Sequence, residues 1–213
     1  MDSLAMKPDE IEIESFRIID KEAGEHGWPD AEWQIVRRAI HTSADFEYVQ
    51  SMVISDGAVE KAIAALRNGA GIVTDTNMAL SGINKARLAS FGCTVSCHVA
   101  DSDVAELAQR EGITRSIAAM RKAIKNPDNQ IFVIGNAPTA LFELLRLTAE
   151  GMAQPALIIG LPVGFVGAEE SKNALATADL GSIPFITNIG RKGGSNVAAA
   201  VVNALAILAA DQK

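Results

Sequence analysis

The chain has few of the residues that build disulfides, metal sites and aromatic platforms. Its 213 residues include 2 cysteines and 3 histidines, and 5% of them are aromatic. Cys93 and Cys97 stand four positions apart in one predicted strand, which argues against a disulfide between them. The histidines are scattered and no H-E-x-x-H or C-x-x-C pairing occurs, so no metal site is predicted. With no secretory signal at the N-terminus, a reducing, cytoplasmic location is expected.

The chain also lacks a basic patch and a membrane-spanning run. Residues 1–47 hold 12 acidic and 5 basic side chains and so carry the whole net charge of -7. Nucleic-acid binding therefore has little electrostatic support. The longest apolar run, residues 197–210, is interrupted by Asn203 and is shorter than the roughly 20 residues of a membrane span. We expect no membrane or nucleic-acid partner, and an anionic small ligand would need a local cationic pocket.

The remaining composition, 48% hydrophobic with 17 glycines, is typical of an α/β protein. One domain is predicted over residues 1–213, with a helical N-terminal part at 1–55 and an alternating βα core at 56–213. Strands alternate with helices in this core, which predicts a mostly parallel five-stranded sheet with helices on both faces. The predicted strands cover residues 71–76, 93–99, 130–135, 156–161 and 184–188.

Ligands of such sheets bind outside the carboxyl ends of the strands. The residues expected there are Asp75, Thr76, His98, Asp101, Gly135, Asn136, Pro162, Gly164, Arg191 and Lys192. The segment GRKGGSN, residues 190–196, combines two cations with a helix cap, which favours anion binding, although a solvated basic turn has the same pattern. Arg115 in the first turn of a predicted helix opposes the helix dipole, so either an anionic ligand or a nearby acid, Asp101 or Glu111, should compensate it.

The glycine-rich segment at 160–167 matches neither dinucleotide nor P-loop spacing, so specific nucleotide binding is weakly supported. It is either a strand-to-helix turn that needs positive φ or a place where backbone approaches a flat, bulky ligand. Lys172 follows it in the next predicted helix.

His41 is the candidate for acid-base chemistry. An apolar helical run leads into it and the N-cap formers Thr42, Ser43 and Asp45 follow, which places the imidazole at a reachable junction. Histidine is a side chain suited to proton transfer near neutral pH, but the pattern is equally consistent with a packed structural histidine. The residues alone therefore indicate an α/β protein that binds a compact, anionic ligand.

Six segments in order resemble the precorrin-8X methylmutase and cobalt-precorrin-8 methylmutase family of corrin (vitamin B12) biosynthesis. The similarity runs from about residue 15 to 205. The segments TDTNMALSGINK and GRKGGSNVAAA are closer in sequence to the cobalt-dependent branch. The segments are HTSADF (41–46), TDTNMALSGINK (74–85), GITRS (112–116), FVIGNAPTALFELL (132–145), LPVGFVGAEESK (161–172) and GRKGGSNVAAAVVNAL (190–205).

The resemblance implies an isomerase that shifts a methyl group from C11 to C12 of a tetrapyrrole disc bearing acetate and propionate groups. It implies no external cofactor, cobalt being carried by the substrate where present, and a homodimer with sites near its interface. His41 then becomes the catalytic acid/base, and a carrier that holds the tetrapyrrole without converting it is the alternative. The residues expected to contact the substrate are Ser15, Arg38, Arg115, Asn136, Lys172 and Arg191.

Overall fold

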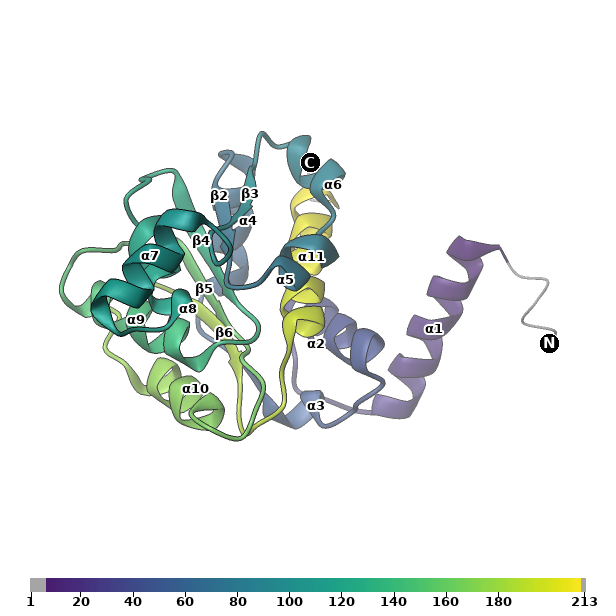
Figure 1. Cartoon of the computed structure of the whole chain (residues 1–213). Coiled ribbons are helices and arrows are strands. Elements are labelled where there is room, and N and C mark those ends of the chain that lie inside the picture. The colour runs from purple at the N-terminus through teal and green to yellow at the C-terminus, as the bar shows by residue number, and fades with distance from the viewer. Residues whose placement is uncertain (1–6, 212–213) are drawn as a thin grey trace.

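A six-stranded sheet runs through the protein and helices cover both of its faces (Figure 1). The computed structural model describes residues 7–211. The strands are β1 (Met52–Ile54), β2 (Gly71–Thr74), β3 (Val95–Cys97), β4 (Asn129–Ile134), β5 (Leu157–Gly160) and β6 (Phe185–Asn188). The helices are α1 (Pro8–Ala23), α2 (Asp30–Ser43), α3 (Tyr48–Ser51), α4 (Ala58–Arg67), α5 (Asn77–Gly82), α6 (Lys85–Ala89), α7 (Ser102–Glu111), α8 (Arg115–Ala123), α9 (Pro138–Ala149), α10 (Ala168–Thr177) and α11 (Ser195–Asp211).

The sheet has the order β1-β6-β5-β4-β2-β3. The five predicted strands are all present and pair in parallel, which confirms the fold class. The prediction of five strands misses β1, which pairs antiparallel with β6 through Met52 opposite Asn188 and Ile54 opposite Ile186. Residues 52–54 had been expected in the helical N-terminal part. Three residues are too few to show an alternating pattern, so the partner strand determines this one.

Alternation along the strands divides the core into two layers. In β4, Ile131 and Val133 pack with α2, α4 and α11 on one face, while Phe132 and Ile134 pack with α8, α9 and α10 on the other. This is the period of two that a strand imposes, here with both faces apolar because both are covered. The C-terminal helix α11 is buried along most of its length and contacts α2, α4 and α5.

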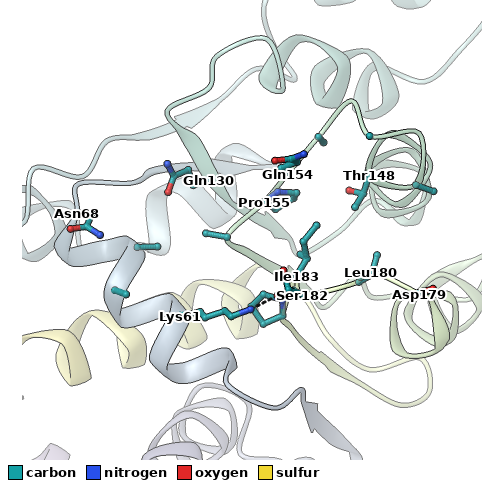
Figure 2. Close-up of a pocket in the computed structure, with 17 residues that line it drawn as sticks. Lys61, Asn68, Gln130, Thr148, Gln154, Pro155, Asp179, Leu180, Ser182 and Ile183 are labelled. Atoms are coloured by element: carbon teal, nitrogen blue, oxygen red, sulfur yellow. Dashed lines mark hydrogen bonds between the residues drawn. The ribbon is translucent and has the colours of Figure 1, made fainter.

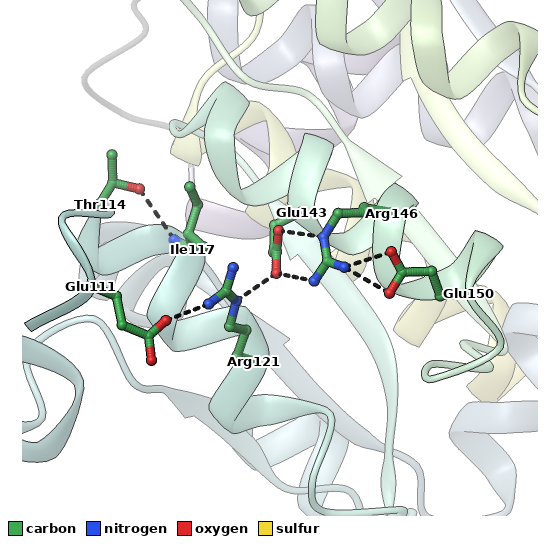
Figure 3. A network of polar contacts seen from close by, with 7 residues as sticks. All are labelled: Glu111, Thr114, Ile117, Arg121, Glu143, Arg146 and Glu150. Carbon is green, nitrogen blue, oxygen red and sulfur yellow. Dashed lines mark hydrogen bonds and ion pairs between the residues drawn. The ribbon is translucent and has the colours of Figure 1, made fainter. Parts of the chain in front are cut away.

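Ion pairs tie α7, α8 and α9 together on the second face (Figure 3). Glu143, 7% exposed, accepts hydrogen bonds from Arg121 and Arg146, both at 2.7 Å. Burial raises the pKa of Glu143, but the two guanidinium groups outweigh burial and hold it below its usual value. Arg121 also reaches Glu111 at 2.7 Å and Arg146 reaches Glu150 at 2.7 Å. Glu111, one of the two acids expected to compensate Arg115, is therefore paired within this network.

Helix α1 extends away from the other elements and packs mainly on α2 (Figure 1). Polar contacts fix its position: Arg37 pairs with Asp20 at 3.0 Å, Arg38 pairs with Glu12 at 2.6 Å, and the Trp33 indole donates to Asp20 at 2.9 Å. In the described part of the chain, no helix combines the length and the apolarity that crossing a membrane requires.

Candidate active site

The carboxyl ends of β2, β4, β5 and β6, with the loops that follow them, form one edge of the sheet, which we call the carboxyl edge. At its centre lies Asp75, directly after β2 and 1% exposed. Its carboxylate accepts three backbone N–H groups, from Gly135 at 2.9 Å, Asn136 at 2.9 Å and Ala137 at 2.7 Å. Burial raises the pKa of Asp75 and these three donors oppose that rise. Asp75 thus holds the β4–α9 turn, and both of its oxygens are engaged there.

Close packing fixes the neighbouring turn to the start of α11. A Cβ on Gly135 would lie 2.7 Å from the Cα of Ser195, so only glycine fits this contact. The Thr76 hydroxyl, which caps α5 by accepting from Ala79 N, lies 2.8 Å from the Ser195 hydroxyl. The turns after β2 and β4 and the start of α11 are therefore one rigid unit.

His41 lies in the last turn of α2, exposed to solvent. Its ring contacts Phe16 of α1 with centroids 5.0 Å apart and planes tilted by 44°. The guanidinium carbons of Arg37 and Arg38 lie 4.4 Å and 5.0 Å from the same Phe16 ring. Phe16 therefore gathers His41 and two cations along the α1–α2 seam, and no hydrogen bond within residues 7–211 occupies the His41 imidazole.

A small cavity opens beside His41. It measures about 240 Å³, and Ser15 of α1 lines it together with His41. The Ser15 hydroxyl donates to the carbonyl of Ile11 in its own helix at 2.8 Å. The other lining residues are Ile18, Ile19, Glu22, Ile40, Ala44 and Phe46. The structure thus brings the predicted pair Ser15 and His41 to one cavity, whose remaining wall is mostly apolar.

Arg38, Arg115 and Asn136 occupy different surroundings. Arg38, three residues before His41, is paired with Glu12. Arg115 is exposed at the start of α8, where the preceding Thr114 hydroxyl lies 3.1 Å from the Thr139 hydroxyl of α9. Asn136 exposes its side chain on the carboxyl edge.

Neither acid expected to compensate Arg115 does so within residues 7–211. Asp101 pairs with His98 and Lys122, and Glu111 pairs with Arg110 and Arg121. The cation is therefore available to a ligand.

Arg191 and Lys172 differ most in exposure. Arg191, exposed, has its guanidinium carbon 5.7 Å from the Phe165 ring and its Nε 3.8 Å from Glu169. Lys172 is 0% exposed in α10, and its ammonium donates to Asn188 and to the carbonyl of Lys192. Burial lowers the pKa of Lys172 to about 8. Its expected contact with a substrate stays a prediction, since the side chain has no surface in this conformation.

Sequence reasoning missed the roles of Phe16 and Lys192. Phe16 follows Ser15 directly, and the scarcity of aromatic residues was the one signal that could have drawn attention to it. The Lys192 ammonium reaches Asp45 at 2.5 Å and Glu47 at 2.6 Å, just beyond His41. Nothing in the sequence indicates that pairing, because more than 140 residues separate the partners.

A larger hollow lies at the opposite edge, before the amino ends of β4, β5 and β6 (Figure 2). It measures about 710 Å³ and is lined mainly by small and amide side chains, among them Asn68, Gln130 and Gln154. Its lysine, Lys61, donates to the carbonyl of Ser182. The lining of this hollow includes no histidine and no arginine, in contrast to the residues at the carboxyl edge. Among residues 7–211, no three His, Cys, Asp or Glu side chains lie close enough to hold a metal ion.

Comparison with known proteins identifies the family of this fold. The sequence model of precorrin-8X methylmutase matches residues 10–208. The chain belongs to the precorrin-8X methylmutase family. It is 51% identical to the cobalt-precorrin-8 methylmutase of Priestia megaterium, over 97% of this chain and 90% of that protein. It is 42% identical to the precorrin-8X methylmutase of Pseudomonas aeruginosa, over 91% and 92%.

Among solved structures, the precorrin-8X methylmutase of Thermus thermophilus superposes with a TM-score of 0.87 at 44% identity, covering 96% of this chain and 97% of that one. The resemblance read from the six sequence segments is confirmed. Within a precorrin-8X methylmutase fold, the His41 cavity and the cations of the carboxyl edge are the features that remain to be given chemical roles.

Proposed function

We propose that this protein is an isomerase of cobalamin biosynthesis that moves a methyl group from C11 to C12 of (cobalt-)precorrin-8. The family match over residues 10–208 carries this proposal. One carbon–carbon bond breaks and another forms within the same molecule, so no oxidant or reductant is consumed. The proposal includes no external cofactor, and any cobalt belongs to the substrate. The protein acts in the cytoplasm, where thiols such as the free Cys93 and Cys97 stay reduced.

His41 is the acid/base of this reaction. It is exposed, borders the cavity and has a free imidazole among the described residues. It donates a proton or hydrogen bond to the macrocycle, which makes the π-system electron-poor and favours migration of the methyl group. The proton returns to His41 once the new bond has formed. Positioned acid-base groups contribute roughly 10²- to 10⁴-fold to such rates.

The cations hold the rim of the disc. Arg115 and Arg191 are exposed near the carboxyl edge, and guanidinium groups pair with carboxylates in a bidentate manner. Arg38 lies one helical turn before His41 on α2 and exchanges Glu12 for a substrate carboxylate. Asn136 and Ser15 add hydrogen bonds from the turn after β4 and from α1. Because the rearrangement is unimolecular, orientation and electrostatics are the enzyme's main contribution.

The active enzyme is a homodimer. The cavity beside His41, about 240 Å³, is too small to enclose a tetrapyrrole, whereas binding sites cover most of their ligand's surface. Helix α1 also presents three isoleucines to solvent, with Ile11 47%, Ile13 68% and Ile18 41% exposed. Exposed apolar side chains on an outlying helix are typical of a surface that packs on a second copy. That copy would supply the missing wall of the site.

Spectroscopy tests the proposed reaction. Mixing the protein with (cobalt-)precorrin-8 should change the visible spectrum as conjugation of the product extends. His41→Ala should still bind tetrapyrrole, with turnover reduced roughly 10²- to 10⁴-fold. His26→Phe is the matched control, because it removes a histidine that stacks on Trp33 and keeps the stack. Absence of conversion by the wild type would refute the function, and near-normal turnover by His41→Ala would refute its role alone.

A further inference from the structure

The loop after β6, residues 189–194, contacts both the end of β5 and the turn that follows His41. We call it the cationic loop, since it contains Arg191 and Lys192. On one side it rests on the end of β5: Gly194 N donates to Leu161 O at 2.9 Å, and Gly164 N donates to Arg191 O at 3.2 Å. The contact is close enough that a Cβ on Gly193 would collide with the Leu161 carbonyl oxygen. The loop is therefore seated on a strand end.

Lys172 fixes the backbone of the cationic loop. Its enclosed ammonium donates to the backbone carbonyl of Lys192 and, at 3.2 Å, to the Asn188 side-chain oxygen. Asn188 in turn donates to the Lys192 carbonyl at 3.0 Å and to the Ile189 carbonyl at 3.1 Å. No carboxylate within residues 7–211 pairs with the Lys172 ammonium, and burying an unpaired charge is costly. The buried ammonium fixes the position of the Lys192 backbone.

The Lys192 side chain then reaches the turn that follows His41. Its ammonium pairs with Asp45 at 2.5 Å and Glu47 at 2.6 Å. These acids come just after Ala44, which ends α2 in the left-handed conformation with φ 53°. At the same place the Asn196 side chain donates to the Thr42 carbonyl at 3.4 Å. The end of α2 that carries His41 is thus fastened to the cationic loop.

We infer that Lys172 and Lys192 act in series as positioning residues for His41. Lys172 fixes the Lys192 backbone, and Lys192 fixes the acidic turn that sets where α2 ends and how His41 faces the substrate. This positioning role takes the place of the substrate contact expected for Lys172 from the sequence. The inference rests on the proposed function, because it assigns these lysines to the methyl shift. A displacement of 1 Å at a reacting group can cost 10²-fold in rate, so a fastening of this kind has a measurable effect.

A double-mutant cycle on the full-length protein tests the inference. Lys192→Met should lower kcat roughly 10- to 100-fold and leave KM within about twofold, because the substrate-binding arginines stay in place. The double variant Asp45→Asn/Glu47→Gln should lose as much, and adding Lys192→Met to it should cost nothing more. A lysine that binds a substrate carboxylate would instead raise KM and cause a further loss in that background, which would overturn the inference.

Two further variants separate positioning from general stability. Lys172→Met should lower kcat in the same way, and Lys192→Arg, which keeps a cation for both acids, should recover most of the rate. Lys122→Met is the matched control, since Lys122 also bridges two acids, Asp101 at 2.8 Å and Asp103 at 2.7 Å, away from α2. If the wild type converts the substrate but Lys192→Met keeps its kcat, the inference fails alone. If the wild type converts nothing, the proposed function fails.

Discussion

The burial of Lys172 cannot be predicted from its residue type or its neighbours in the sequence. It follows two acidic residues in a helix, a pattern typical of a solvated charge, yet the folded chain encloses it completely. Its hydrogen bonds run to a carbonyl and an amide oxygen, and no carboxylate within residues 7–211 forms an ion pair with it. Nothing local marks that outcome, because it depends on where β6 and its loop lie in the fold.

The lowered pKa of Lys172 predicts a specific dependence of stability on pH. Burial lowers the pKa from 10.5 to about 8 in the folded state, so between these values the folded chain has released a proton that the unfolded chain retains. The free energy of unfolding contributed by this group should therefore rise as pH increases from 8 to 10.5, by about 1.4 kcal/mol for each pKa unit of the shift. Urea unfolding of the wild type and Lys172→Met at pH 7.5 and 9.5 measures the difference, which should move in favour of the wild type.

Lys122→Met provides the comparison. Hydrogen bonds to Asp101 and Asp103 raise the pKa of Lys122, so it stays protonated in both states across this pH range. Its contribution should be constant from pH 7.5 to 9.5. If Lys172→Met gave an equally constant difference, the ammonium would not be desolvated as the structure shows.

At the scale of elements, local patterns predicted most of the fold. All five parallel strands lie where apolar runs and turn residues placed them. Strand β1 is the exception, since its three residues acquire their conformation by pairing with β6. The site follows the same division. His41 and Ser15 were recognisable in sequence, whereas the contacts of Phe16 and Lys192 join segments that only the tertiary fold brings together.

The junction of β4 with α11 leaves no room for an added side chain at Gly135. Gly135→Ala would place a Cβ 2.7 Å from the Ser195 backbone, and overpacking of this kind costs roughly 1–3 kcal/mol. The shift should also disturb the turn whose N–H groups Asp75 accepts. Urea denaturation measures the decrease in the free energy of unfolding directly. Gly27→Ala is the control, because no atom lies within 4 Å of its Cβ position, and it should be neutral or slightly stabilising.

At the scale of the whole molecule, the two edges of the sheet differ in chemistry and not only in shape. The larger hollow, about 710 Å³, lies at the amino edge, whereas the cavity at His41 is about 240 Å³. The candidate acid-base residue His41 lines the smaller one, and the exposed Arg115 and Arg191 lie at the carboxyl edge. A site that has its chemistry in place but too little enclosure requires additional surface, and α1, standing apart from the other elements, is positioned to exchange such surface between two copies (Figure 1).

A charge on α1 should therefore separate the copies. Wild-type protein should sediment at twice the mass of one chain, while Ile13→Glu, which places a carboxylate at a side chain 68% exposed, should sediment as a monomer. Turnover should fall with dimer content, because each His41 cavity loses the wall that the second copy supplies. Met152→Glu alters an apolar side chain 51% exposed at the amino edge and should leave both mass and turnover unchanged. A wild type that stays monomeric at micromolar concentration while converting substrate would show that one chain encloses the tetrapyrrole by itself.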